Sequence, residues 1–251
     1  MNVFRVLRWG VEVAEGLRRG KYRSGYWEQE PSVVNDNDNA HYLQSDDSIR
    51  LNIAAAKFDT LPASSYPGFY WVDKYAGMLS VNGIVDIWDF GGAYGFDYFK
   101  LNRYVSHPFT YTVAEIPEIV EHARQLPELS KFSFVSGQIP EQSPDILYSN
   151  GTTMNASQYL FAFIEKARPQ RIVLSAVECS DGPTFYTVQT LRKTKRRCVY
   201  TTFNRKELIS TIEKFGYRLD DCARGSEQGS GVFLRKPLKV YYYSFAFTRI
   251  S

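Results

Sequence analysis

The sequence of 251 residues has few of the side chains that metal sites and disulfides need. There are three cysteines, Cys179, Cys198 and Cys222, and three histidines, His41, His107 and His122. An odd number of widely spaced cysteines argues against a disulfide framework and suggests a reducing compartment. Neither set has the spacing of metal ligands, so we predict that the protein holds no metal.

The sequence also lacks a long apolar run and a large net charge. No stretch approaches the roughly 18 apolar residues of a membrane-spanning helix, and the first residues do not resemble a secretory signal. A net charge of +3 is too small to imply a nucleic-acid partner. We therefore expect a cytoplasmic protein, without a transmembrane segment, that consists of one large domain or of one domain with an extension.

The segment from 3 to 19 has two interpretations. Its apolar residues fall roughly on one face of a predicted helix, and four arginines make the helix basic. In one interpretation the helix packs on the domain or on a second copy of the chain, in a homo-oligomer. In the other it contacts the inner face of a membrane as a peripheral anchor. Glu12 and Glu15 weaken the membrane interpretation, so we favour packing.

The stretch from Ile84 to Gly95 organises the rest of the chain. It is an apolar, β-rich run that closes with Asp89 and a glycine cluster. This pattern predicts a buried strand, a tight turn and a helix that begins near Phe96. Doubly wound α/β proteins bind nucleotide-like ligands at such a turn. We expect the glycines to let the backbone approach a ligand where a Cβ atom would clash.

The spacing of the glycines excludes two common nucleotide motifs. In the pattern G-x-G-x-x-G the later glycines would fall on Ala93 and Phe96, or on Tyr94 and Asp97, and the Gly-Lys-Ser/Thr end of a Walker motif is missing. The pattern Asp-x-Gly-x-Ala-x-Gly resembles instead the first motif of class I S-adenosylmethionine (SAM) methyltransferases. The resemblance implies that SAM is the cofactor and that its methionine end is held by Asp89, Gly91, Gly92, Ala93 and Gly95.

Residues at the ends of the following strands extend the cofactor site. The second predicted strand ends in Glu115, about 20 residues past the last glycine of the turn, where an acid accepts hydrogen bonds from ribose hydroxyls. Ile116 follows it and can flank an adenine edge. Many methyltransferases place an acid after the third strand for the adenine amino group, and here Gln138 or a backbone carbonyl must serve. Asn150 follows the fourth strand at the same edge.

The alternation of elements predicts an α/β fold, and the resemblance implies that this fold is a Rossmann-like class I methyltransferase. We expect a mostly parallel seven-stranded sheet, a C-terminal antiparallel hairpin and an N-terminal helical extension. We expect residues 1–80 to form the helical or cap extension and residues 81–251 to form the SAM-binding methyltransferase domain. Strands are predicted at 84–90, 109–115, 132–135, 145–149, 171–177, 217–223, 232–234 and 240–248, with a turn at 224–231.

The helix predictions rest on end signals. A helix is predicted at 46–58, with Asp46 or Asp47 as its N-cap and Ile49, Ile53, Ala54 and Phe58 facing inward. Another helix is predicted at 96–104, a third ends at Ala167, and Asn204 caps a fourth that ends at Phe215. The proline-bounded stretch before the fourth strand is too short for a crossover helix.

A closer resemblance rests on four strings: Asp-Phe-Gly-Gly-Ala-Tyr-Gly (89–95), Val-Ala-Glu-Ile-Pro (113–117), Asp-Gly-Pro-Thr-Phe-Tyr-Thr-Val-Gln (181–189) and Phe-Asn-Arg-Lys-Glu-Leu with Phe-Gly-Tyr (203–208, 215–217). They are similar to a family of bacterial methyltransferases associated with cell-envelope polysaccharide genes, over roughly residues 70 to 235. The resemblance implies methyl transfer. We expect the acceptor to be a small molecule or glycan, namely a sugar or glycolipid intermediate of a bacterial surface polysaccharide.

Methyl transfer to a sugar hydroxyl needs a base that removes the hydroxyl proton. The candidates are Glu178 and Asp181 after the fifth strand, and His41 or His107 from caps and loops. Two other functions stay open. An inactive methyltransferase fold could act as a binding or scaffolding subunit, which the intact turn and Glu115 argue against. A nicotinamide-dependent sugar-modifying enzyme is the other, and the missing glycines argue against it.

Overall fold

The computed structural model describes residues 21–25, 44–58, 67–80, 83–191, 197–233 and 236–250. The predicted helix at 3–19 and the base candidate His41 therefore lie outside the described residues.

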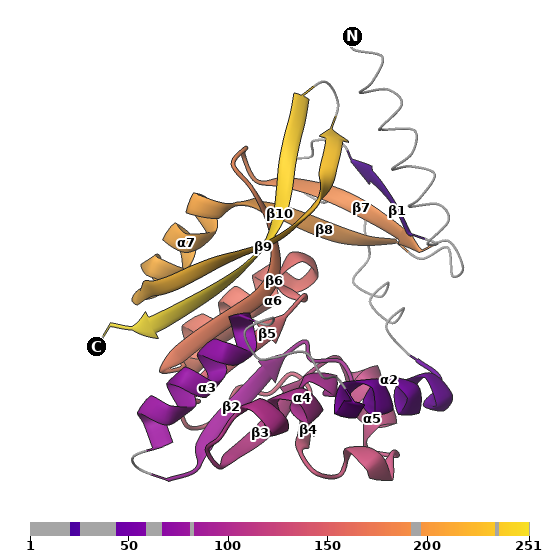
Figure 1. Ribbon diagram of the computed structural model, residues 1–251, viewed down its shortest axis with the longest axis vertical. Helices are drawn as coiled ribbons and strands as arrows, with labels where there is room; N and C mark the ends of the chain where they lie inside the picture. The colour runs from indigo at the N-terminus through magenta and orange to yellow at the C-terminus, as the bar shows by residue number, and fades with distance from the viewer. Residues whose placement is uncertain are drawn as a thin grey trace.

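The core of the fold is a sheet whose seven central strands follow the order β4-β3-β2-β5-β6-β10-β9 (Figure 1). These strands are β2 (Val85–Phe90), β3 (Phe109–Ala114), β4 (Ser133–Val135), β5 (Ile146–Asn150), β6 (Arg171–Ser180), β9 (Tyr217–Phe233) and β10 (Lys236–Arg249). The strands from β4 to β6 are parallel, and β10 pairs antiparallel with both β6 and β9. The strand order reverses between β2 and β5, and ligands bind outside the carboxyl ends of the strands at such a point. The predicted parallel sheet with a C-terminal antiparallel hairpin is confirmed.

Helices cover both faces of this sheet. One face packs against α2 (Asp46–Phe58), α3 (Pro67–Leu79), α4 (Phe96–Tyr104) and α5 (Pro117–Ala123), and the short 3-10 turn η4 (Pro127–Leu129) follows α5. The other face packs against α6 (Thr153–Ala167) and α7 (Arg205–Lys214). Each face has its own apolar cluster, because the strands are buried on both sides and their side chains alternate between the faces.

Several helix-end signals were interpreted correctly, but the N-cap residue of α2 was not. The bounds of α2 and α4 agree with the prediction, and the Asn204 side chain caps α7 by accepting from the backbone N–H groups of Lys206 and Glu207. The predicted N-cap of α2 was wrong, because Ser45 precedes the helix and its hydroxyl accepts from the Ser48 N–H at 3.4 Å. Asp46 is the first helical residue, so its carboxylate is free for another contact.

The inward face of α2 also differs in part from the prediction. Ile49 and Ile53 are buried as expected, together with Ala56. Phe58 is 81 % exposed, because it lies two residues past the buried Ala56 and therefore on the opposite side of the helix.

No helix lies between β4 and β5 within residues 136–145, as the short proline-bounded stretch predicts. The face of β3 that such a helix would cover carries Thr110, which is exposed, and Thr112, which is half-buried. The opposite face of the same strand carries the buried Tyr111 and Val113. The sequence of β3 therefore alternates between an apolar covered face and a more polar face.

The structure adds three strands that the sequence pattern did not predict. β6 continues past Val177 to Ser180, and the hairpin β7 (Phe185–Leu191) and β8 (Arg197–Asn204) follows, with β1 (Lys21–Gly25) paired to β7. Since β10 pairs along the whole of β6, β8 takes the edge of β6 that β5 leaves after Ser175. This small antiparallel layer therefore lies beyond the carboxyl end of β5.

The predicted turn at 224–231 is a second correction. β9 runs from Tyr217 to Phe233 without interruption and pairs with β10 through three shifts of register. The glycine- and serine-rich segment is therefore irregular strand and not a turn, because pairing with the strongly β-forming β10 overrides its local preference.

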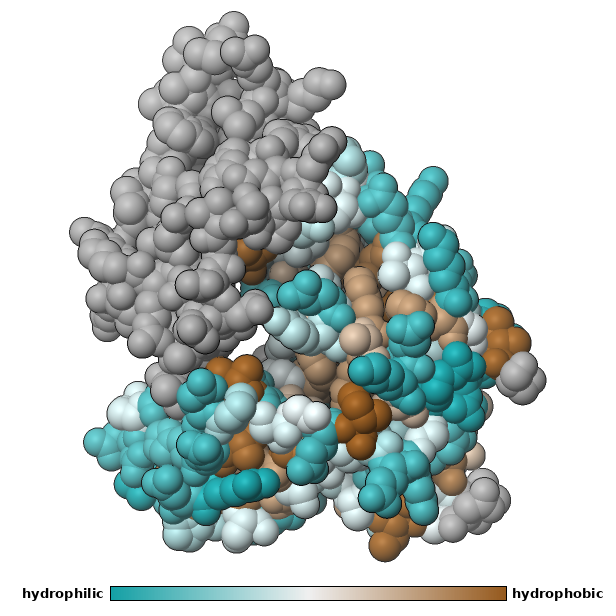
Figure 2. Space-filling view, turned by 180° about the vertical axis from the view of Figure 1, so that it is seen from behind, coloured by the Kyte–Doolittle hydropathy of each residue, from teal (hydrophilic) through white to brown (hydrophobic). Residues whose placement is uncertain are grey.

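The surface is mixed in character. Seen from behind, hydrophilic residues dominate the outline of the described part, and hydrophobic residues appear near the middle and in small separate groups (Figure 2). Exposed apolar side chains such as Leu51, Met78 and Ile84 belong to different elements. Scattered residues of this kind are ordinary on a globular protein. Among the described residues, no helix has both the length and the apolar character needed to cross a membrane.

Candidate functional site

The glycine turn joins β2 to α4 through three left-handed residues. The φ angles are 70° at Gly91, 50° at Ala93 and 69° at Gly95, which is the residue that precedes α4. The turn is closed by backbone hydrogen bonds from Gly91 N to Ala114 O at 2.9 Å and from Gly95 N to Gly92 O at 2.8 Å. Ala93 is the residue that departs from the all-glycine motif, and a left-handed conformation costs a non-glycine residue about 1 kcal/mol.

The three glycines are required by contacts with the protein itself. A Cβ atom on Gly91 would lie 2.2 Å from the Thr152 side chain, one on Gly92 would lie 2.0 Å from Asp89 Oδ2, and one on Gly95 would lie 2.3 Å from the Phe132 ring. The Thr152 hydroxyl also donates to Gly91 O at 2.8 Å, so the start of α6 is fastened to the turn. We expected a ligand to lie beside the glycines, but on these sides of the backbone the space is filled by protein atoms.

Asp89 lies beneath the turn and is 1 % exposed. Its Oδ2 accepts a hydrogen bond of 2.5 Å from the Tyr111 hydroxyl, whereas Oδ1 has no hydrogen-bond partner in the described part of the chain. Burial raises the pKa of Asp89 well above its ordinary value, and the nearby charge of Asp97 raises it further. A buried carboxylate with a free acceptor atom is a group that a cation or a hydrogen-bond donor would stabilise.

Asp97 lies in the first turn of α4, and two side chains of strand β5 bind its carboxylate. Its Oδ2 accepts hydrogen bonds from the Tyr148 hydroxyl at 3.0 Å and from Asn150 Nδ2 at 2.7 Å. Burial raises the pKa of Asp97, and these two donors lower it. Asn150 thus lies at the ligand edge, as predicted, and its amide holds Asp97.

Glu115 lies beside the turn, immediately after β3. Its backbone N–H donates to Val135 O at 3.0 Å, and its carboxylate lies near the backbone N–H groups of Ile116 and Ala93. Burial raises the pKa of Glu115 to about 7, and the two backbone donors act against this. The acid and the glycine turn are about 20 residues apart in the sequence, and they lie side by side because β2 and β3 are parallel neighbours.

The remaining predicted cofactor residues lie at the same edge. Ile116 is partly buried and precedes Pro117, the first residue of α5. Gln138 is exposed, three residues past the end of β4.

The predicted bases lie in different environments. Glu178 is 2 % exposed within β6, and the Thr202 hydroxyl of β8 donates to it at 2.6 Å. Asp181 is exposed in the turn between β6 and β7. His107 precedes β3 and therefore lies at the amino edge of the sheet, where its Nδ1 is 3.1 Å from the Ser80 hydroxyl. This position excludes His107 from the ligand edge, which is a correction.

Some residues of this edge were missed in the sequence analysis. The hydroxyls of Tyr111 and Tyr148 donate to the buried carboxylates of Asp89 and Asp97, respectively. In the sequence these two tyrosines resemble ordinary core aromatics. Asp97 had a visible signal, because it is an acid in the first helical turn after the glycines. No group of three or more histidine, cysteine, aspartate or glutamate side chains among the described residues could hold a metal ion.

One solved structure has a similar overall fold. It is a 1,6-didemethyltoxoflavin-N1-methyltransferase from Burkholderia thailandensis, with S-adenosylhomocysteine and 1,6-didemethyltoxoflavin bound. The TM-score is 0.51 at 16 % identity, and the match covers 91 % of this chain and 96 % of that chain. The fold is that of a class I methyltransferase. At this identity the likeness shows the methyltransferase fold alone.

Two other SAM-dependent methyltransferases of solved structure are similar at lower scores. One from Clostridium acetobutylicum has a TM-score of 0.48 at 10 % identity, covering 86 % of this chain and 99 % of that chain. One from Methanosarcina mazei has a TM-score of 0.48 at 13 % identity, covering 66 % of this chain and 93 % of that chain. No protein-family model matches the sequence, and no curated protein matches it.

Proposed function

We propose that the protein is a SAM-dependent methyltransferase whose donor site is formed by the glycine turn and Glu115. The observation that carries this proposal is the position of the Glu115 carboxylate beside the backbone N–H of Ala93, at the carboxyl ends of two neighbouring parallel strands. A carboxylate accepts several hydrogen bonds at once, so Glu115 can hold ribose hydroxyls while it stays tied to the turn. Ile116 flanks the adenine, and Gln138 or a neighbouring carbonyl meets the adenine amino group.

The methionine end of the donor suits the buried acids below the turn. The sulfonium and the ammonium group of SAM are both cationic, and Asp89 carries a buried oxygen with no hydrogen-bond partner in the described part of the chain. The charge of Asp97 adds to the negative potential there, and Asn150 fixes its carboxylate. When bound, SAM supplies a methyl group that is electrophilic because it is attached to a sulfonium. The residues Gly91, Gly92, Ala93 and Gly95 shape the backbone that orients this end.

The acceptor in this proposal is a hydroxyl of a sugar or glycolipid intermediate of a bacterial surface polysaccharide. Support comes from the four strings that resemble methyltransferases associated with polysaccharide genes. The acceptor reaches the site from beyond the carboxyl end of β5, where the layer of β7, β8 and β1 begins. The chain must align the hydroxyl with the donor and exclude water.

Three side chains are candidates for the base that takes the hydroxyl proton. Asp181 is exposed near the carboxyl end of β6, which makes it the first to test. The Glu178 carboxylate is 2 % exposed and accepts from Thr202, so an acceptor hydroxyl reaches it less readily than it reaches Asp181. His41 remains a candidate from the N-terminal extension.

The N-terminal extension completes the proposal. Residues 1–80 act as a cap and residues 81–251 as the methyltransferase domain. The cap prediction is supported by α2 and α3, which pack on the same apolar cluster as the glycine turn. Two further predictions concern the same extension. Residues 3–19 contact the inner face of a membrane, or the chain assembles with a second copy.

Calorimetric titration with SAM and S-adenosylhomocysteine tests the donor site. We expect micromolar binding to the unmodified chain and a loss of at least about tenfold in Glu115→Ala, which is about 1.4 kcal/mol. The matched control is Glu118→Ala, an exposed acid in the first turn of α5 that should leave binding unchanged. If the folded, unmodified chain binds neither ligand, the methyltransferase proposal fails and the scaffold function takes its place.

The acceptor is tested separately. The chain is incubated with SAM labelled with deuterium in its methyl group and with a set of sugar nucleotides and lipid-linked sugars, and the products are examined by mass spectrometry. Label in a sugar, lost in Asp181→Asn with donor affinity retained, would support the assignment of the base. Transfer of label to a non-sugar acceptor alone would overturn the choice of acceptor and leave the donor site intact.

A further inference from the structure

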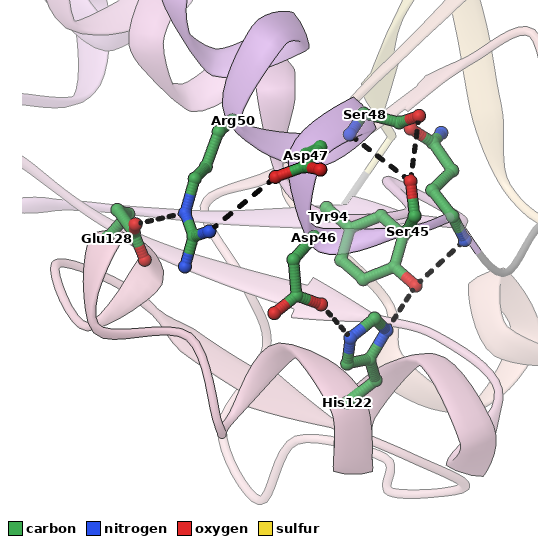
Figure 3. A network of polar contacts seen from close by, with 9 residues as sticks. Ser45, Asp46, Asp47, Ser48, Arg50, Tyr94, His122 and Glu128 are labelled. Carbon is green, nitrogen blue, oxygen red and sulfur yellow. Dashed lines mark hydrogen bonds and ion pairs between the residues drawn. The ribbon is translucent and has the colours of Figure 1, made fainter.

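A chain of polar contacts ties the glycine turn to the first helix of the described part. Tyr94 belongs to the turn, and its hydroxyl lies 2.9 Å from His122 Nδ1 in α5. His122 Nε2 lies 2.9 Å from Asp46 Oδ1 at the start of α2. The backbone N–H of Gln44, just before α2, donates to the same Tyr94 hydroxyl at 3.4 Å. Figure 3 shows the imidazole of His122 between the hydroxyl of Tyr94 and the carboxylate of Asp46.

The chemistry of the side chains indicates which atoms donate in this series of contacts. A carboxylate only accepts, so Nε2 of His122 carries a hydrogen and donates it to Asp46. In the neutral ring Nδ1 is then an acceptor, and the Tyr94 hydroxyl donates to it. The Tyr94 oxygen keeps a lone pair for the Gln44 N–H. Each of these three contacts therefore joins a donor to an acceptor.

Tyr94 is a rigid link in this chain. Its side chain is fully buried, and its ring meets the His122 ring edge-on, with centroids 5.6 Å apart. Tyr94 follows Ala93, whose N–H lies beside the Glu115 carboxylate in the proposed donor site. Ala93 and Gly95 on either side are both left-handed, which fixes the path of the backbone between them. A shift of the Tyr94 side chain therefore shifts the backbone group that contacts Glu115.

A second tie, one helical turn further along α2, does not reach the glycine turn. Arg50 Nε lies 2.8 Å from Glu128 Oε1 of η4, and Asp47 lies 3.9 Å from another nitrogen of Arg50 (Figure 3). Both pairs are accessible to solvent, and ion pairs of this kind contribute little to stability. They hold α2 to the domain but make no contact with Tyr94 in the described part of the chain.

We propose that Tyr94, His122 and Asp46 form a latch that couples the docking of α2 to donor binding at the glycine turn. These three are positioning residues, and the coupling rests on the proposed function as a SAM-dependent enzyme. Coupling between two sites is reciprocal, so a bound donor tightens the docking of α2 as much as a docked α2 tightens donor binding. The docking of α2 therefore changes the affinity of the proposed donor site.

Hydrogen exchange and calorimetry on the full chain test the latch with S-adenosylhomocysteine as the probe. We expect the ligand to slow amide exchange over residues 46–58 of the unmodified chain. Tyr94→Phe keeps the buried ring and loses only the hydroxyl, and Asp46→Asn keeps the helix start. Each should weaken ligand binding about three- to tenfold and abolish the slowing of exchange, and the double variant should be no weaker than either single variant, because the three groups act as one unit.

The matched control is Asp47→Asn, which removes a first-turn acid of α2 outside the latch. It should leave both ligand affinity and the slowing of exchange unchanged. If Tyr94→Phe and Asp46→Asn bind the ligand as the unmodified chain does and α2 is still protected, the latch is overturned while the donor site stands. Additive losses in the double variant would also overturn it. If the unmodified chain binds no ligand, the donor site and the latch are overturned together.

Discussion

The pH dependence of donor binding follows from the carboxyl group of Glu115, whose pKa is raised by burial to about 7. Ribose hydroxyls donate to the ionised form, so the donor and the proton compete for this carboxylate. With a pKa of about 7, the carboxyl is about 9 % ionised at pH 6 and about 91 % ionised at pH 8. We therefore expect the affinity for S-adenosylhomocysteine to rise about tenfold between these two pH values, which is about 1.4 kcal/mol.

Calorimetric titration at pH 6, 7 and 8 measures this slope, and Glu115→Gln is the comparison. Glutamine keeps an acceptor oxygen for the Ala93 and Ile116 N–H groups but does not titrate. The variant should bind more weakly at pH 8, with a flat profile once the titration of the ligand's own amino group, which is common to both proteins, is divided out. Parallel profiles for the two proteins would refute the assignment of Glu115 to the donor.

The same variant separates binding from stability. The folded pKa of Glu115, about 7, lies above its ordinary value of 4.5. The stability that this shift contributes is therefore fully present below pH 4.5 and is lost as the pH rises through about 7. At pH 8 the buried charge destabilises the free protein, so Glu115→Gln should raise the thermal midpoint of the free protein while it weakens ligand binding. A lower midpoint at pH 8 would show that the carboxylate has a structural role instead.

Three further predictions concern the fold. Gly95→Ala should lower the free energy of unfolding by about 2–3 kcal/mol in urea denaturation, because its Cβ would meet the Phe132 ring, whereas Gly137→Ala, with a similar φ of 64° and nothing within 4 Å, should cost only about 1 kcal/mol. Equal losses would contradict this steric account. Asn204→Ala should cost about 1 kcal/mol through loss of the α7 cap, and no loss would mean that water or a neighbour replaces it. Cys179 is buried and its thiol pKa is raised by burial, so mass spectrometry should find it unalkylated by iodoacetamide until the chain unfolds, and rapid native labelling would contradict its burial.

Local patterns predicted the central sheet well. The run that ends in Asp89 and the strand that ends in Glu115 are apolar, bounded by turn residues and separated by a helix with clear ends, so each element is specified by its own residues. The contact between Glu115 and the glycine turn was also foreseeable, because parallel neighbours place their carboxyl ends together. The antiparallel hairpin at the end of the chain followed from its strong β-forming residues.

Other features depended on partners that lie far away in the sequence. No strands were predicted at 185–191 and 197–204, although both segments are rich in β-forming residues; β8 pairs with the edge of β6 that the central sheet leaves free, and β7 pairs with β8. The continuity of β9 through its glycines has the same cause, since β10 supplies the pairing. Edge pairing of this kind is a tertiary effect that overrides weak local preference.

The sequence by itself determined the order of the elements, the glycine turn and the acid beside it, because hydrophobic period, glycine spacing and helix caps act within a few residues. The tertiary structure alone decided which atoms fill the space around the glycines, which tyrosines hold Asp89 and Asp97, and that His122 joins Tyr94 to Asp46. The hydrogen bonds among these contacts join residues 22 to 76 positions apart. Their geometry is fixed only when the helices pack on the sheet, since no local preference distinguishes a core tyrosine from one whose hydroxyl must reach a buried acid.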